Sequence, residues 1–391
     1  MMESNLRKYI DHSSISYAPE WNQFDWSHLK RKVKKLQMRI AKAVKNNKYR
    51  LVKTLQYLLT RSFYAKILSV KRVTSNSGRK TPGVDGVKWN TDRRKLRAIF
   101  SLNWKGYKSL PLRRIYIEKK NGKLRPLGIP TMSDRAHQAL YALALEPIAE
   151  TTADPNSYGF RPYRSTKDAM GQCFCALAKS YSPRWILEAD IKGCFDNISH
   201  KWLMENIPME KKILKTWLKS GYLDGKKFFE TKNGTPQGGI ISPLLMNMTL
   251  DGIERAIKSV ASCKKKINVI RYADDFIVTG ESKELLEEKV KPKIIEFLAT
   301  RGLSLSEEKT RIVNIEDGFD FLGQNVRKYN GKLLIKPSKA SVSSIRAKIR
   351  DVAKTNKSSE TISLIRKLNP VIRGWSNYHK GICAKKVFGK L

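Results

Sequence analysis

The sequence is poor in acidic residues, cysteine and histidine. Its 391 residues include 35 Asp and Glu against 77 Lys and Arg, which gives a formal net charge of +42. Five cysteines without a CxxC pair argue against a disulfide framework, and five scattered histidines argue against a zinc site. Because free cysteines are typical of a reducing compartment, we expect a cytoplasmic protein.

Long hydrophobic runs are also missing. No apolar stretch approaches the roughly 20 residues of a membrane helix, and residues 1–25 lack the apolar core of a signal peptide. A basic protein can instead bind a membrane surface, but no lipidation signal supports that alternative. The basic residues are spread along the whole chain, which favours a long groove that binds the phosphates of a nucleic acid.

The hydrophobic pattern changes along the chain. From Trp26 to about Val73 it has the helical period and predicts two basic amphipathic helices separated at Asn46-Asn47. Beyond this region, strand-like segments flank Asn121-Gly122, a strong signal for a β-hairpin. Helices and strands therefore both occur, and their mixed order predicts an α+β fold.

Further elements follow from the same patterns. We expect helices over Asp134 to Glu150, Ser165 to Lys179 and Leu244 to Ile257, a strand over Trp185 to Asp190, hairpins at 269–280 and at Asn330-Gly331, and helices after Pro337.

Two acidic signals suggest chemistry. Asp190 ends an apolar strand before a glycine-containing turn, and Asp274-Asp275 lies between two short apolar segments. Each signal alone also fits a structural role, since an aspartate can cap a turn and a solvated turn tolerates two carboxylates. Together they could supply the oxygen ligands for a pair of divalent cations about 3.5–4 Å apart, as phosphoryl transfer requires.

A third signal is the glycine-rich segment 234–243, which reads GTPQGGIISP. Glycine lets the backbone approach a nucleotide closely. A tight turn before a helix, with Pro243 in the first helical turn, explains the glycines and the proline equally well. It does not explain Gln237.

These motifs, in this order, resemble those of group II intron reverse transcriptases. The similar segments are Ala189 to Asp196, Pro236 to Gly239 and Tyr272 to Asp275, together with Thr81 to Gly86, Leu124 to Pro130 and Tyr158 to Pro162. The resemblance implies an α+β right-hand polymerase with fingers, palm and thumb and a helical N-terminal extension. It divides the chain into an extension at 1–80, fingers and palm at 81–335, and a helical thumb that begins a maturase region at 336–391.

The resemblance also implies roles for individual residues. Asp190 and Asp274 would be the main catalytic metal ligands, and Asp275 would complete the acidic cluster. Phe195 would exclude the ribose 2′-hydroxyl, although a core aromatic residue is the alternative. The other residues implied to bind the nucleotide are Lys119, Arg125, Gln237 and Lys309. Lys119 and Arg125 could instead be solvated strand residues, and Lys309 a helix-surface lysine.

The implied activity is RNA-directed DNA synthesis with two Mg²⁺ ions, for which Mn²⁺ could substitute. The expected partners are an RNA template, a DNA or RNA primer, dNTPs and group II intron RNA, with no membrane, while the oligomeric state is left open. A splicing cofactor that only binds RNA and a reverse transcriptase of a bacterial defence or diversity-generating system are the alternatives. Family proteins usually continue beyond the thumb, and whether a part was removed after Leu391 cannot be read from the sequence.

Overall fold

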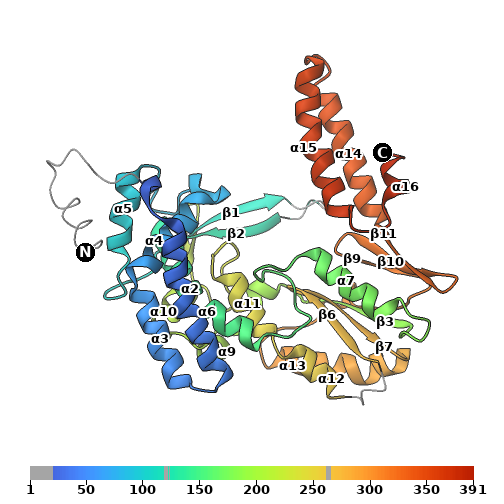
Figure 1. Cartoon of the computed structure of the whole chain (residues 1–391), viewed down its shortest axis with the longest axis horizontal. Helices are drawn as coiled ribbons and strands as arrows, with labels where there is room; N and C mark the ends of the chain where they lie inside the picture. The colour runs from blue at the N-terminus through green and yellow to red at the C-terminus, as the bar shows by residue number, and fades with distance from the viewer. Residues whose placement is uncertain (1–20, 119–121, 123, 261–265) are drawn as a thin grey trace. The chain divides into compact units, whose positions relative to one another are not determined.

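The computed structural model describes residues 21–118, 122, 124–260 and 266–391. The chain folds into two compact units, each built from segments far apart in the sequence (Figure 1). Unit 1 comprises Met1–Ala153, Lys192–Asp251 and Leu298–Ser304, and unit 2 comprises Asp154–Ile191, Gly252–Phe297 and Leu305–Leu391. Each unit has its own hydrophobic core.

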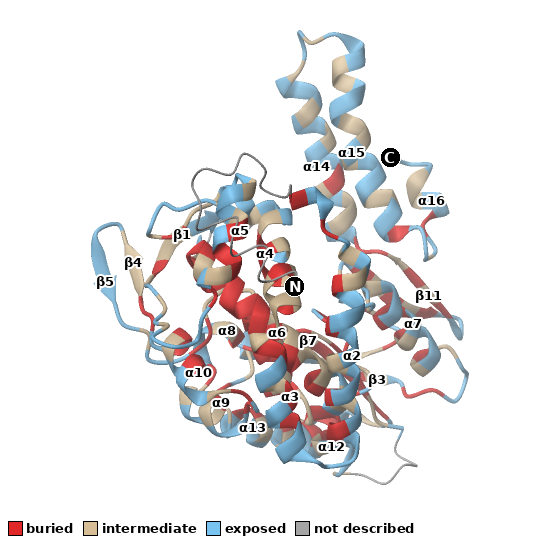
Figure 2. Ribbon diagram, turned by 60° about the vertical axis from the view of Figure 1, so that its left-hand side comes forward, coloured by how far each residue is buried: buried red, intermediate tan, exposed pale blue. Residues whose placement is uncertain are grey.

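Helices dominate unit 1. They are η1 (Trp21–Gln23), α2 (Trp26–Lys45), α3 (Tyr49–Arg61), α4 (Phe63–Ser75), η2 (Ser77–Lys80), α5 (Asp92–Ser101), α6 (Met132–Thr152), α8 (Cys194–Asn197), α9 (His200–Asn206), α10 (Lys211–Leu218) and α11 (Ser242–Leu250). The helices α2, α3 and α4 pack against α6, which is largely buried and coloured red in Figure 2.

The N-terminal helical region contains three helices where the sequence predicted two. The predicted break is confirmed, because α2 ends at Asn46 and Asn47 has a φ of +54°. A second break lies at Ser62, whose extended backbone separates α3 from α4. No asparagine, glycine or proline marks this second break, so the sequence did not predict it.

A four-stranded sheet completes unit 1. Its strands are β1 (Leu112–Glu118), β2 (Leu124–Ile129), β4 (Tyr222–Asp224) and β5 (Lys227–Phe229), in the order β2-β1-β4-β5. The strands β1 and β2 pair antiparallel, as the predicted hairpin requires. Asn121 of the predicted turn lies outside the described residues. The sequence analysis did not predict β4 and β5.

The central sheet of unit 2 has the order β6-β7-β3-β8. Its antiparallel strands are β3 (Trp185–Asp190), β6 (Asn268–Tyr272), β7 (Asp275–Gly280) and β8 (Arg311–Asn314). The structure therefore confirms both the predicted strand ending at Asp190 and the predicted hairpin at 269–280.

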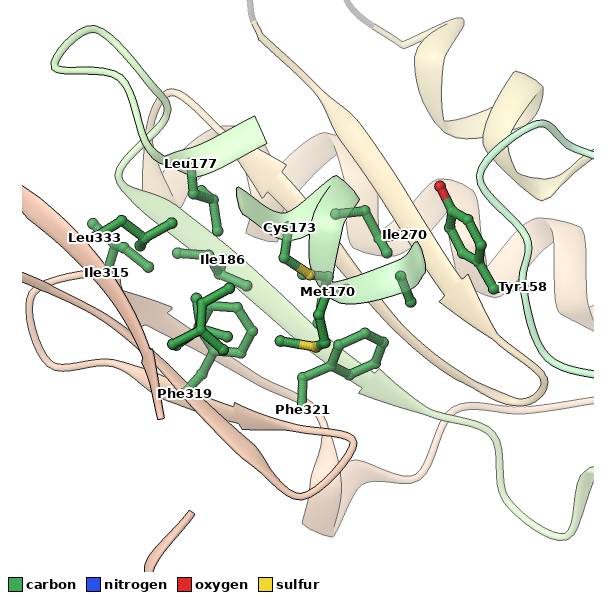
Figure 3. Close-up of a cluster of buried hydrophobic side chains, with 14 residues drawn as sticks. Tyr158, Met170, Cys173, Leu177, Ile186, Ile270, Ile315, Phe319, Phe321 and Leu333 are labelled. Atoms are coloured by element: carbon green, nitrogen blue, oxygen red, sulfur yellow. The ribbon is translucent and has the colours of Figure 1, made fainter. Parts of the chain in front are cut away.

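A three-stranded sheet packs beside α7 in unit 2. It has the order β11-β10-β9, from β9 (Phe319–Phe321), β10 (Gln324–Tyr329) and β11 (Lys332–Pro337). Figure 3 shows Phe319 and Phe321 in one buried cluster with Met170 of α7. The hairpin predicted at Asn330-Gly331 is confirmed, and both turn residues have positive φ.

The helices of unit 2 lie before, between and after these strands in the sequence. They are α7 (Thr166–Leu177), α12 (Ile253–Lys258), η4 (Leu285–Val290), α13 (Lys291–Ala299), η5 (Glu307–Lys309), α14 (Lys339–Thr355), α15 (Thr361–His379) and α16 (Lys385–Phe388). The single helix predicted over Leu244 to Ile257 is wrong, because the chain breaks at Gly252, whose φ is +95°. Within the described ranges no helix is long and apolar enough to cross a membrane.

Candidate active site

Two carboxylate residues face each other at one end of the central sheet of unit 2. Asp190, the last residue of β3, is the register partner of Asp275, the first residue of β7. In an antiparallel pair such residues have Cβ atoms about 4.5–5.5 Å apart. Asp274 precedes Asp275 in the turn from β6, where Ala273 has a φ of +61°. The three acidic residues predicted as metal ligands therefore belong to one strand end and one turn.

The environment of Asp275 opposes its negative charge. Burial, followed by repulsion from Asp190 and Asp274, raises the pKa of Asp275 to about 7. A carboxyl with such a pKa holds its proton near neutrality unless a cation lies beside it. This strand end is therefore a place where added positive charge is favourable.

Lys309 supplies part of that charge. Its Nζ lies 2.8 Å from Oδ2 of Asp190, and this hydrogen bond raises the pKa of Lys309. The backbone holds the two residues in place, because the N–H of Ser306 donates to the carbonyl of Asp190 at 2.8 Å. The side chain of Lys309 is 66% exposed. It can therefore leave Asp190 when another cation or an anionic ligand arrives.

A second ion pair adjoins the cluster. Arg311 on β8 donates to both carboxylate oxygens of Glu188, at 2.8 and 3.2 Å. Burial raises the pKa of Glu188, and the hydrogen bond from Arg311 opposes this rise. Sequence analysis did not select Glu188 as a candidate. Its position two residues before Asp190 was the available signal, because alternate strand residues share one face.

The donor set fits a hard divalent cation. In the described part of the chain, no three His, Cys, Asp or Glu side chains are already arranged as a metal-ligand group. However, carboxylate oxygens are the ligands that Mg²⁺ prefers, and a bound cation would reverse the pKa shift of Asp275. Asp190 and Asp275, with Asp274 beside them, are thus the residues that could hold Mg²⁺.

The glycine-rich segment 234–239 organises a second set of residues, in unit 1. Gln237 donates from Nε2 to Oδ2 of Asp196 at 2.9 Å, and its carbonyl accepts from the N–H of Gly128 on β2 at 2.7 Å. Gly238 has a φ of +111°, and a Cβ there would lie 2.6 Å from the carbonyl oxygen of Gly128. Glycine is therefore required at this close approach of two backbones.

This segment also touches the helix that carries Phe195. The N–H of Thr235 donates to the carbonyl of Phe195 at 2.6 Å, and a Cβ on Gly234 would lie 2.5 Å from the same oxygen. Phe195 is half-buried, so part of its ring is accessible. The segment thus links α8, with Phe195, to β2, which carries Arg125.

The predicted site residues fall into two groups. Asp190, Asp274, Asp275 and Lys309 are together in unit 2, whereas Arg125, Phe195 and Gln237 belong to unit 1. Arg125 is an exposed residue of β2 and the register partner of Ile117. Lys119 lies outside the described residues.

Three family sequence models match the chain. The model described as reverse transcriptase (RNA-dependent DNA polymerase) matches residues 117–326. The N-terminal domain of reverse transcriptase matches residues 21–102, and the group II intron maturase-specific domain matches residues 342–391.

Individual proteins also resemble the chain. Protein YkfC of Escherichia coli K12 is 32% identical over 302 residues, which are 65% of this chain and 78% of YkfC. The group II intron-encoded protein LtrA of Lactococcus lactis is 30% identical over 341 residues, and this chain spans only 56% of its length. A solved structure of telomerase from Candida albicans matches 69% of this chain and 54% of its own, with 13% identity and a TM-score of 0.42.

Proposed function

Since the chain belongs to the group II intron reverse transcriptase and maturase family, we propose that it extends a primer 3′-hydroxyl along an RNA template by phosphoryl transfer. Residues 117–326 form its RNA-directed DNA polymerase domain. Members of this family generally depend on Mg²⁺. The proposal goes further and assigns two Mg²⁺ ions to Asp190, Asp274 and Asp275, with Mn²⁺ as a substitute.

When bound, the two ions would supply positive charge to the primer oxygen and to the leaving pyrophosphate. Asp190 and Asp275 would hold these ions from two paired strands, and Asp274 would add a third carboxylate from the turn. Lys309 then breaks its hydrogen bond with Asp190 and binds the leaving phosphate through the positive charge of its ammonium group. Its exposed side chain permits this exchange.

The residues of unit 1 are assigned to the incoming nucleotide. Arg125 binds the triphosphate through its guanidinium fork, and Lys119 contributes a further positive charge. The ring of Phe195 excludes a ribose 2′-hydroxyl, so deoxyribonucleotides are preferred. The backbone of Gln237 is held by its hydrogen bond to Gly128 of β2, and its side chain positions the nucleotide and its template base.

The observation that carries the proposal is the pairing of Asp190 with Asp275, whose charges repel each other at a buried strand end. Replacing Asp274 with Ala should abolish primer extension on an RNA template with Mg²⁺, while the affinity for template–primer stays within about threefold. Asp317→Ala is a matched control, because this exposed turn carboxylate lies in the same unit. Retained extension by Asp274→Ala would remove the metal assignment.

A second proposed function is binding of group II intron RNA to assist splicing and retromobility. The maturase-specific match at 342–391 and the net charge of +42 support it. The maturase-specific match also favours the intron type over defence or diversity-generating reverse transcriptases. If phosphate contacts dominate, log affinity for intron RNA should fall steeply with log salt concentration. A slope near zero in a filter-binding titration would contradict this function. The cytoplasmic location stays a prediction.

A further inference from the structure

A short loop in unit 2 exposes two aromatic rings in an unfavourable backbone conformation. Residues 158–164, YGFRPYR, precede α7. Tyr163 has a φ of +61° and its side chain is fully exposed, at 103% of the reference area. Phe160 has a φ of +57° and is 58% exposed. Glycine is the residue type that tolerates such angles, so this backbone conformation is unusual for two aromatic residues.

This conformation needs an explanation outside the folded chain. A bulky residue with positive φ is strained, and such strain persists where the surroundings enforce it, often at ligand-binding sites. Burial of the Tyr163 ring cannot offset this strain, because the ring is exposed to solvent and does not pack in the hydrophobic core. A small or flexible residue would satisfy the fold better, so the ring has no structural reason to be there.

The loop holds the ring in a defined position. Nη1 of Arg161 donates to the carbonyls of Asp154 and Ser157, at 2.9 Å each, and Arg161 itself is buried. On the other side of Tyr163, a capping box of Ser165 and Asp168 fixes the start of α7. The backbone is therefore held on both sides of Tyr163, and the exposure of its ring does not come from a loosely attached loop.

The same loop is fastened to the proposed catalytic turn. The N–H of Tyr158, which Figure 3 shows beside β6, donates to the carbonyl of Arg271 at 2.9 Å. A Cβ on Gly159 would lie 2.4 Å from the backbone nitrogen of Ala273, so only glycine fits at this contact. The start of the loop, four residues before Tyr163, is thus in direct contact with the turn that carries Asp274.

The charge of this surface suits an anionic ligand. Arg164 and Lys167 flank Tyr163, and Lys167 is exposed. The nearest acidic residue along the chain is Asp168, whose carboxylate accepts from the backbone N–H and the hydroxyl of Ser165 at 2.7 Å each. An exposed aromatic ring beside cations is the usual composition of a site where an unpaired base stacks and its phosphate is neutralised.

We propose that an unpaired nucleotide of the RNA template stacks its base on Tyr163 and places a phosphate near Lys167. This inference rests on the proposed function, because it takes the RNA template of that reaction as the ligand. Stacking on a ring face requires a base that is not enclosed in a duplex. The site is therefore specific for single-stranded template, and the paired region does not use it.

The test measures affinity without chemistry. A labelled RNA template annealed to a DNA primer, with a single-stranded template overhang, is titrated by fluorescence anisotropy with Mg²⁺ and without dNTPs. Tyr163→Gly should weaken binding by about five- to 150-fold, the range expected for one stacked base. Tyr163→Phe keeps the ring and should bind within about twofold of the original protein.

The Tyr163→Gly variant also distinguishes a loss of RNA binding from a loss of stability. It relieves the positive φ, so the thermal unfolding midpoint of Tyr163→Gly should stay level or rise despite the weaker binding. Asn330→Gly is the matched control, because Asn330 has a φ of +47° in an exposed turn of the same unit. It should leave the affinity unchanged. Lys167→Ala should lower the slope of log affinity against log salt by about one.

Several outcomes would overturn the inference. Unchanged affinity of Tyr163→Gly would show that the ring does not bind RNA. An equal loss on a blunt, fully paired duplex would exclude an unpaired base, and a loss seen only with intron RNA would exclude the template as the ligand. If the original protein binds the template but never extends the primer, the proposed function fails while the stacking result still stands.

Discussion

Asp190 and Asp275 are direct partners across two antiparallel strands, and burial makes this an unfavourable place for two negative charges. Every residue of β7 after Asp275 is buried, and so are three of the five residues of β3 before Asp190. The apolar packing of these two strands therefore places the carboxylates where water screens their charges poorly.

A pH dependence follows from Asp275. Its pKa in the folded protein is about 7, against a usual value of 3.8, so between these values the folded state holds a proton that the unfolded state releases. The free energy of unfolding of the metal-free protein should therefore fall as pH rises through this window. Asp275→Asn should reduce this fall, as measured by denaturant unfolding at pH 5 and pH 8.

Ionisation of the same carboxyl should make Mg²⁺ binding depend on pH. Because the cation needs the ionised form, Mg²⁺ should raise the unfolding midpoint more at pH 8 than at pH 6 in the original protein. Asp275→Asn should show little stabilisation at either pH. Equal stabilisation of both proteins would mean that Mg²⁺ binds elsewhere.

Lys309 should matter more for the rate than for nucleotide binding. Its Nζ is positioned at Asp190, so Lys309→Ala removes a charge that the proposal places on the leaving pyrophosphate. We expect kcat for primer extension to fall by about 10²-fold with a small change in KM. Lys332→Ala, at an exposed position of β11, serves as the control. A loss confined to KM would instead assign Lys309 to binding of the nucleotide before reaction.

Phe195 offers a test of sugar selection. Replacing it with Ala removes the ring proposed to exclude the 2′-hydroxyl, so the ratio of kcat/KM for dNTPs to that for rNTPs should fall by about tenfold or more. Single-nucleotide extension with each substrate measures this ratio. If Phe195→Ala lowers the unfolding midpoint and leaves the ratio unchanged, the ring is a packing residue only.

Arg135 should be a stability residue. It is buried in α6 and donates to the carbonyls of Pro130, Gly78 and Thr81, at 2.9, 3.0 and 2.7 Å. Arg135→Met would leave these carbonyls without a donor, and we expect a loss of about 3 kcal/mol in the free energy of unfolding.

Arg94→Met is the comparison for this variant, since Arg94 also donates to a carbonyl but is exposed. It should cost less than about 1 kcal/mol. Urea unfolding of the two variants gives both values. Equal losses would show that burial of the guanidinium does not set the cost.

Local signals explain what the sequence predicted well. The strand ending at Asp190 and the hairpins at 269–280 and Asn330-Gly331 depend on short apolar runs and on turn residues, which are properties of neighbouring residues. The family match also confirms the predicted α+β right-hand polymerase fold with a helical N-terminal extension. The boundaries 1–80, 81–335 and 336–391 stay a prediction.

Contacts between distant residues explain what the sequence did not predict. The strands β4 and β5 have three residues each, and β4 joins the sheet by pairing with β1, more than 100 positions earlier in the chain. The helix expected over Leu244 to Ile257 breaks at Gly252, whose N–H donates to Asp154, 98 positions away. The ion pair of Lys309 with Asp190 spans 119 positions. No local pattern contains such information, so only the family resemblance pointed to Lys309.

The interleaving of the two units has a consequence for synthesis on the ribosome. Unit 1 includes residues 298–304 as well as the N-terminal segment. Unit 2 begins at Asp154 and extends, with interruptions, to Leu391. The nascent polypeptide must therefore carry an incomplete, strongly cationic first unit until most of the message has been translated. During that interval, polyanions such as the transcript itself are available as a counterion before the polymerase is finished.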